Sequence, residues 1–125
     1  MTENDISYAV RGAIFRVYTQ LGPGLLESVY EAALMYELKK NGMVAQSQVP
    51  VPVHYDNEKL DIVFRVDILV ENRVIIEIKS VENLAEVHHK QVLTYLRLTG
   101  LKLGLLVNFN TADIGQAIYR KVNNL

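Results

Sequence analysis

The stretch that decides the fold of this chain is Arg65-Val66-Asp67-Ile68-Leu69-Val70-Glu71-Asn72-Arg73-Val74-Ile75-Ile76-Glu77-Ile78-Lys79-Ser80. Two apolar, β-branched runs are separated by a short polar break, which is typical of a β-hairpin of two buried strands. Three charged residues, Asp67, Glu77 and Lys79, interrupt these runs. A charge in a buried strand is costly unless it is paired or binds a metal, so these three residues need compensation.

The loop length of this hairpin decides which side chains share a face, because side chains alternate along a strand. A three-residue loop at 71–73 makes Val70 face Val74 and Asp67 face Glu77. A two-residue Asn-Arg loop would separate the acids onto opposite faces, and that pair is not favoured in such turns. We therefore predict an apolar face and an opposite face that carries the acids. The apolar face comprises Val66, Ile68, Val70, Val74, Ile76 and Ile78, and the other comprises Asp67, Leu69, Ile75, Glu77 and Lys79.

The composition is that of an ordinary globular protein. The chain has 125 residues, of which 50% are hydrophobic and 22% charged, so we expect a single domain over 1–125. There is no cysteine, which excludes disulfides and thiolate sites. No apolar run or signal-like N-terminus is present, so we expect a cytoplasmic protein without a membrane partner. The net charge of −1 gives no overall attraction to nucleic acid.

The first half of the chain predicts two helices and an edge strand. Apolar residues at three- and four-residue spacing indicate a helix that ends near Gln20, with Asp5 or Ser7 as its cap. The Gly-Pro-Gly turn at 22–24 ends it, and a second helix follows at about 25–41. Its predicted buried side comprises Leu26, Val29, Ala33, Leu34 and Leu38. The alternation at 43–55, with two prolines, favours an edge strand.

After the hairpin, the pattern indicates a helix at about 82–99 and an apolar strand at 102–109 that is buried on both faces. A turn and a short strand at 117–122 complete the chain. The order is helix, helix, three strands, helix, strand and a short final strand. This order predicts an α/β fold, in which a mixed β-sheet is flanked by helices.

Two carboxylates that face each other on adjacent strands can share a hard cation such as Mg²⁺ or Mn²⁺. Asp67 and Glu77, with Lys79 beside them, would then support metal-assisted phosphodiester hydrolysis, in which the lysine stabilises developing negative charge. The alternative is an ion pair of Lys79 with Glu77 or with Asp67 at the end of the sheet.

Four helical residues could complete this site. Glu27 and Tyr30 are three apart and share a helix face, although an acid in a first turn is also explained by the helix dipole. Gln91 and Tyr95 are four apart and could position phosphate or water, or form a polar helix flank. The adjacent His88 and His89 point about 100° apart, so we interpret them as surface or phosphate-contacting residues.

Four motifs resemble those of one nuclease family in their order along the chain. They are Leu21-Gly22-Pro23-Gly24-Leu25-Leu26-Glu27-Ser28-Val29-Tyr30, then Asp67 with Glu77-Ile78-Lys79, then Gln91-Val92-Leu93-Thr94-Tyr95-Leu96, and Leu103-Gly104-Leu105-Leu106-Val107-Asn108-Phe109. The set resembles the GxxExxY family of the PD-(D/E)xK nuclease superfamily. One departure is Tyr18, which stands where family members usually carry a histidine.

The resemblance implies a restriction-endonuclease-like core and a nuclease that acts on DNA or RNA. It implies that Asp67, Glu77 and Glu27 are metal ligands for Mg²⁺ or Mn²⁺ and that Lys79 is the catalytic lysine. The backbone carbonyl of Ile78 is a further candidate ligand, and we assign substrate positioning to Tyr30, Gln91 and Tyr95. Arg65, Lys90, Arg97 and Lys102 are available for backbone contacts.

The competing hypothesis is a catalytically silent binding or interaction module that retains the nuclease core, because function resides in the site and not in the fold. Small nucleases of this fold often form homodimers that span a duplex. A homodimer would therefore favour the enzyme, whereas a monomer without a positive surface would favour the binding module.

Overall fold

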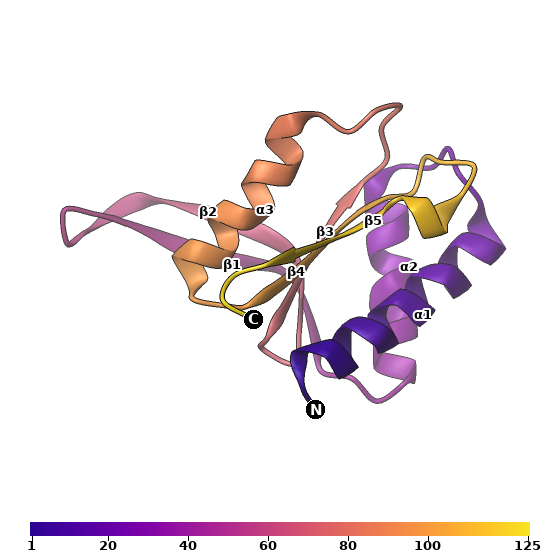
Figure 1. Cartoon of the computed structure of the whole chain (residues 1–125), viewed down its shortest axis with the longest axis horizontal. Coiled ribbons are helices and arrows are strands. Elements are labelled where there is room, and N and C mark those ends of the chain that lie inside the picture. Colours follow the sequence, from indigo (N-terminus) through magenta and orange to yellow (C-terminus); the bar gives the residue numbers. More distant parts are fainter.

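The computed structural model describes all 125 residues, which form one five-stranded mixed sheet and three α-helices (Figure 1). The elements in chain order are α1 (Glu3–Leu21), α2 (Glu27–Lys40), β1 (Ala45–Tyr55), β2 (Glu58–Val70), β3 (Val74–Lys79), α3 (Glu86–Thr99), β4 (Leu103–Asn108), the 3₁₀ helix η1 (Ile114–Gln116) and β5 (Ile118–Val122). The strand order is β1-β2-β3-β4-β5, and only β3 and β4 run parallel. The predicted α/β fold is confirmed, including the short final strand.

The helices cover opposite faces of the sheet. Helices α1 and α2 lie together on one side, and α3, which connects the parallel strands β3 and β4, lies on the other (Figure 1). The main core joins apolar residues of α1 and α2 to alternate residues of β2, β3 and β4. A smaller core beneath α3 contains Leu96 and Ile75. No helix is long and apolar enough to cross a membrane.

The three-residue hairpin loop between β2 and β3 is confirmed. Val70 pairs with Val74, and the ladder continues to Ile68 and Ile76, where it stops. The face assignment is wrong at one position, because Val66 packs in the smaller core and not with the main one. Beside Val66 the β1–β2 ladder is interrupted, because Gln48, whose φ is 52°, and Asp67 opposite it form no regular pair, although the register is the same on both sides. The regular alternation of faces therefore breaks next to Asp67.

Two predicted helix boundaries and one predicted buried face need correction. Thr2, and not Asp5 or Ser7, caps α1, and Asp5 closes a capping box by accepting from the Thr2 N–H. Helix α3 begins at Glu86, four residues later than predicted. Leu26 and Val29 are 75% and 41% exposed, so they do not belong to the buried side of α2. The fully buried residues of α2 are Tyr30, Leu34 and Leu38.

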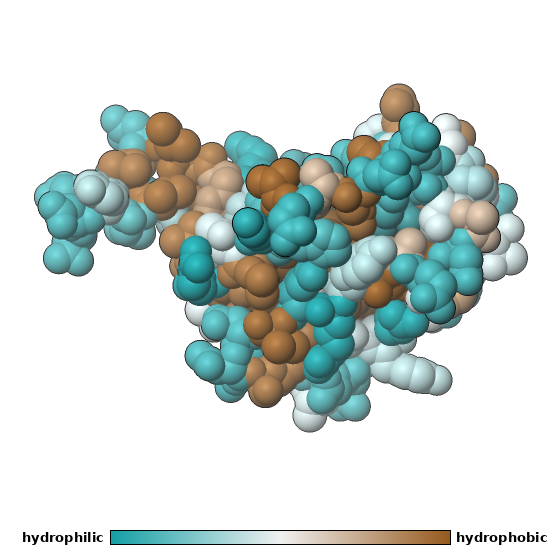
Figure 2. Space-filling view, turned by 45° about the horizontal axis from the view of Figure 1, so that its top comes forward, coloured by the Kyte–Doolittle hydropathy of each residue, from teal (hydrophilic) through white to brown (hydrophobic).

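Strand β1 is an edge strand, as its prolines predict. The paired ends of β1 and β2 extend beyond the rest of the sheet and the helices (Figure 1). Ile62 and Val63 on this extension are 67% and 45% exposed, and Figure 2 shows hydrophobic side chains along it. The extension therefore contributes little to the core, which lies between the other strands and the helices.

Gly104 of β4 allows α3 to pack closely against the sheet. A Cβ atom added there would lie 2.8 Å from Val92 Cγ1, although the backbone of Gly104 needs no positive φ. We expect Gly104→Ala to lower the free energy of unfolding by about 1–3 kcal/mol through overpacking, since a buried valine has little rotational freedom to move aside. Urea unfolding measures this loss. In a Val92→Ala background the same change should cost much less, and an equal cost in both backgrounds would contradict the explanation.

Candidate active site

Asp67 and Glu77 lie side by side, and each carboxylate accepts from a backbone N–H of the opposite strand. The Ile78 N–H donates to Asp67 Oδ2 at 2.8 Å, and the Asp67 N–H donates to Glu77 Oε2 at 3.3 Å. These bonds cross between the strands just beyond the last regular ladder pair. The predicted carboxylate pair is therefore held in place by reciprocal side-chain to backbone bonds between β2 and β3.

Glu77 is the most deeply buried charged residue of the protein, with 6% of its surface exposed. Burial is the largest cause of a pKa raised to about 9, and the neighbouring Asp67 raises it further. Lys79 lowers this pKa, but its effect is the smallest. Without a cation, Glu77 is therefore protonated at neutral pH.

Lys79 is half-buried and forms no ion pair. The protein's only ion pair joins Arg16 Nε to Glu37 Oε2 at 3.1 Å, between α1 and α2. The alternative reading of Lys79, as the partner of Glu77 or Asp67 in a salt bridge, is therefore wrong. The lysine ammonium remains available beside the acid pair.

Glu27 links the start of α2 to the end of β3. Its Oε2 accepts from the Ser80 N–H at 3.0 Å, and the Ser80 hydroxyl donates to the Leu25 carbonyl at 2.6 Å. No group of three His, Asp or Glu side chains is arranged to hold a metal ion. The structure thus joins Asp67 to Glu77 and places Glu27 against the residue that follows Lys79.

Tyr30 does not position substrate as predicted, because it is completely buried. Its hydroxyl donates to the Gly22 carbonyl at 2.5 Å and accepts from the Leu25 N–H at 3.1 Å. Its ring stacks on Phe109, with centroids 4.3 Å apart. Tyr30 therefore fixes the Gly-Pro-Gly turn that determines where Glu27 begins α2.

Tyr95 lies near the acid pair. Burial is the main cause of its raised pKa, and the charges of Glu77 and Asp67 raise it further. Its ring stacks on Phe64 of β2, with centroids 4.2 Å apart and planes 9° apart. Gln91, one turn earlier on α3, is exposed. Helix α3 therefore presents a fixed tyrosine near the acids and, one turn earlier, a solvent-exposed amide.

The two histidines of α3 have local roles. His88 Nδ1 accepts from the Ala85 N–H at 3.0 Å and so caps the start of the helix. His89 packs edge-on against Tyr119 of β5, with ring centroids 4.9 Å apart. Tyr18, in the place of the usual histidine, donates its hydroxyl to the Thr111 carbonyl. That bond ties α1 to the loop that follows β4.

A second acid, which sequence reasoning missed, lies beside Asp67. Gln48 Nε2 donates to Glu31 Oε1 at 2.9 Å and to Asp67 Oδ1 at 3.4 Å. Burial raises the pKa of Glu31, and the charge of Asp67 adds a smaller increase. The available signal was that Glu31 follows Glu27 by four residues, which places both on one face of α2. Gln48 gave no signal, because its role depends on the pairing of β1 with β2.

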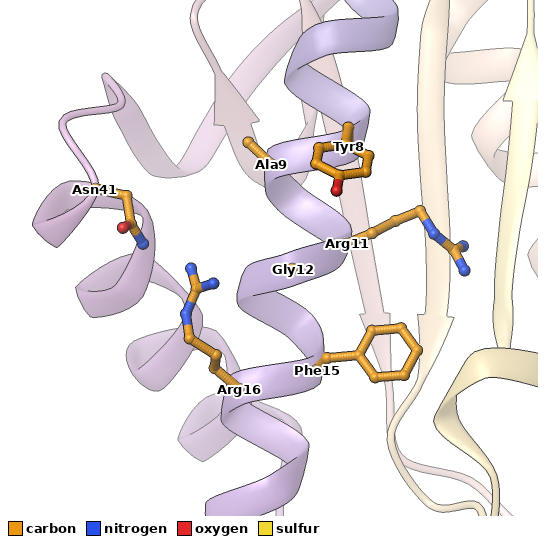
Figure 3. Close-up of a pocket in the computed structure, with 7 residues that line it drawn as sticks. All are labelled: Tyr8, Ala9, Arg11, Gly12, Phe15, Arg16 and Asn41. Atoms are coloured by element: carbon orange, nitrogen blue, oxygen red, sulfur yellow. The ribbon is translucent and has the colours of Figure 1, made fainter.

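The largest surface hollow, about 490 Å³, lies on the outer side of α1 and contains none of the predicted site residues. Figure 3 shows Arg16 extending from α1 towards Asn41 of α2, while Arg11 and Phe15 point to the opposite side. The hollow is lined by Asn41, Arg11 and Arg16 but by no Asp or Glu. It therefore lacks the carboxylate oxygens that usually bind a divalent cation. The predicted site residues therefore lie elsewhere, around Asp67 and Glu77.

Comparisons with known proteins agree with the observed fold. A family model described as the PD-(D/E)XK nuclease superfamily matches residues 4–121. The crystal structure of a protein called SSO0001 is similar, with 28% sequence identity and a TM-score of 0.58 over 78% of this chain. The match covers 50% of SSO0001, so this chain spans about half of that protein's length. No curated protein matches the sequence. The span of the family match and the confirmed fold show that the chain belongs to the PD-(D/E)XK nuclease superfamily.

Proposed function

We propose that this protein is a metal-dependent nuclease that hydrolyses phosphodiester bonds in DNA or RNA, and that it is a member of the GxxExxY group. The observation that carries the proposal is the buried Glu77 beside the half-buried Asp67, two carboxyl groups with no compensating ion pair. A buried carboxylate beside a second acid costs free energy unless a proton or a cation neutralises it, and such groups cluster at functional sites.

The residues at the pair fit Mg²⁺ or Mn²⁺, which favour oxygen ligands. The carboxylates of Asp67 and Glu77 and the Ile78 carbonyl would hold the ion, and Glu27 would add its second carboxylate oxygen, since Ser80 occupies only Oε2. A bound divalent ion would polarise the scissile phosphate and lower the pKa of a water molecule. The acids alone would repel phosphate, so metal should bind before the substrate.

The other residues would act on substrate directly. Lys79, with a free ammonium on the acid face of β3, would orient the attacking water or stabilise the charge that develops on the phosphate. Tyr95, held by its stacking on Phe64, and the exposed Gln91 would contact the phosphate backbone. Tyr30 would act indirectly, through the turn that places Glu27.

The test is a calorimetric titration of the protein with Mg²⁺ and with Mn²⁺, paired with cleavage assays on single-stranded, duplex and branched DNA and RNA. We expect saturable binding of the metal and cleavage that chelation with EDTA abolishes. Metal binding that is absent from the wild-type protein, or cleavage that persists in EDTA, would contradict the proposal.

A catalytically silent nucleic-acid-binding module is the second candidate function. It is favoured by the engagement of Glu27 with the Ser80 backbone, which leaves two acids in mutual contact instead of three. The same assays distinguish the candidates, because a silent module binds nucleic acid without cutting it. Light scattering adds a further criterion, since a homodimer could present two active sites to a duplex and would favour the nuclease.

A further inference from the structure

A polar pocket of about 320 Å³ lies at the carboxyl ends of the parallel strands β3 and β4. We call it the amide pocket, because uncharged polar side chains form most of its wall. Its lining includes Asn83, Asn110, Thr111, Gln116, His89 and Tyr119. These residues come from the loops after β3 and β4, from η1, from α3 and from β5. Its volume falls at the lower end of the range for small-ligand sites.

The amide pocket is the immediate neighbour of Lys79. Asn108, which also lines the pocket, pairs with Lys79 in the parallel register of β3 and β4. Adjacent strands lie about 4.8 Å apart, and paired residues project to the same face of the sheet. The Phe109 N–H donates to the Lys79 carbonyl at 2.9 Å, so the two strands remain joined at this end. A phosphate at Lys79 would therefore have its adjoining nucleoside within reach of the pocket.

The wall of the pocket next to Lys79 is fixed by one buried amide. Asn108 Oδ1 accepts from the Val81 N–H at 3.0 Å, and Asn108 Nδ2 donates to the Val81 carbonyl at 2.9 Å. Its Oδ1 also accepts from the Asn110 N–H at 3.2 Å. Asn108 thus joins the loops that follow β3 and β4 and holds the pocket open between them.

The lining favours a nucleobase and disfavours a phosphate. No lysine or arginine lines the pocket, and its one charged residue is the acid Glu82. The amides of Asn83, Asn110 and Gln116 offer both donors and acceptors, which match the hydrogen-bonding edge of a base. The Tyr119 ring, which is 37% exposed and packs at 83° to His89, lines one side of the pocket, where it can contact the base.

We infer that the amide pocket receives one unpaired base of the substrate, adjacent to the phosphate that is cleaved. The inference rests on the proposed nuclease function and names its substrate class, because a base whose edge is already paired in a duplex cannot enter. The preferred substrate is therefore a single strand, or a duplex with an unpaired nucleotide at the cleavage position.

The first test needs no catalysis. Adenosine, cytidine and their deoxy counterparts are titrated into the metal-free wild-type protein while NMR records the side-chain amide signals of Asn and Gln. We expect concentration-dependent shifts at Asn83, Asn110 and Gln116, and unchanged signals at Asn41, which follows α2. Absent shifts, or shifts of equal size at Asn41, would overturn the inference. A protein that cleaves nothing but shows these shifts would retain the pocket and lose the proposed function.

The second test uses Tyr119→Ala and Tyr119→Phe, with Tyr8→Ala as the matched control because Tyr8 is 83% exposed on α1. Loss of one stacked base typically weakens binding by about tenfold, so Tyr119→Ala should raise KM for single-stranded DNA and RNA by about that factor with little change in kcat. Tyr119→Phe should restore KM, and Tyr8→Ala should have no effect. Equal losses on single-stranded and fully paired substrates, or no loss on either, would overturn the inference.

Discussion

Lys79→Ala should reduce kcat for metal-dependent cleavage by about 10²–10³-fold, which is the usual effect of removing one group that stabilises transition-state charge. Lys79 makes no ion pair in the folded protein, so its loss should leave the free energy of unfolding nearly unchanged. It is not a proposed metal ligand, and Mg²⁺ affinity should not fall. Single-turnover cleavage at saturating Mg²⁺ measures the effect on chemistry, and calorimetry measures metal binding separately.

Two further variants make this result specific. Lys40→Ala removes an exposed lysine from the last turn of α2 and should cleave as the wild type does. Asp67→Asn removes a proposed ligand, so it should lose both metal binding and cleavage. Full activity of Lys79→Ala, or a parallel loss of Mg²⁺ affinity in that variant, would contradict the role assigned to the lysine.

Local pattern predicts the hairpin well, because only one loop length satisfies two independent requirements. The turn residues disfavour a two-residue loop, and only the three-residue loop brings Asp67 opposite Glu77 on one face. The observed pairing of Val70 with Val74 follows from these requirements. Prolines likewise predict the edge position of β1, since a proline cannot donate to a ladder. Each of these predictions depends on chemistry within a few residues.

The rest of the site depends on contacts between distant segments. Gln48 joins Glu31 to Asp67 only because β1 packs beside β2 and beneath α2, an arrangement that no local period encodes. The helix period places Tyr30 and Glu27 on one face of α2. The ring of Tyr30 is nevertheless buried, because Phe109, from the other end of the chain, stacks on it. The partner of Glu27 is Ser80, 53 residues away. Sequence therefore indicates which residues carry chemistry better than it indicates what each one touches.

Glu77→Gln should make the metal-free protein more stable than the wild type at neutral pH, and the difference should grow with pH. The raised pKa of about 9 means that the folded protein keeps a proton on Glu77 that the unfolded chain has released above its ordinary value of 4.5. Between these two values the folded state binds more protons, so rising pH destabilises it by about 1.4 kcal/mol per pH unit from this group. Below 4.5 both states are protonated, and above 9 both are ionised, so the contribution is constant there.

Urea unfolding in EDTA at several pH values between about 5 and 9 measures this slope. Glu58→Gln, at an exposed position in β2, is the matched control and should keep the wild-type slope. A Glu77→Gln variant with that same slope would show that Glu77 is not the titrating group. Saturating Mg²⁺ should reverse the comparison, because the ion stabilises only the ionised Glu77 of the wild type and displaces its proton. Because the metal ion must displace the proton that Glu77 holds in the metal-free protein, metal affinity should rise with pH up to about 9.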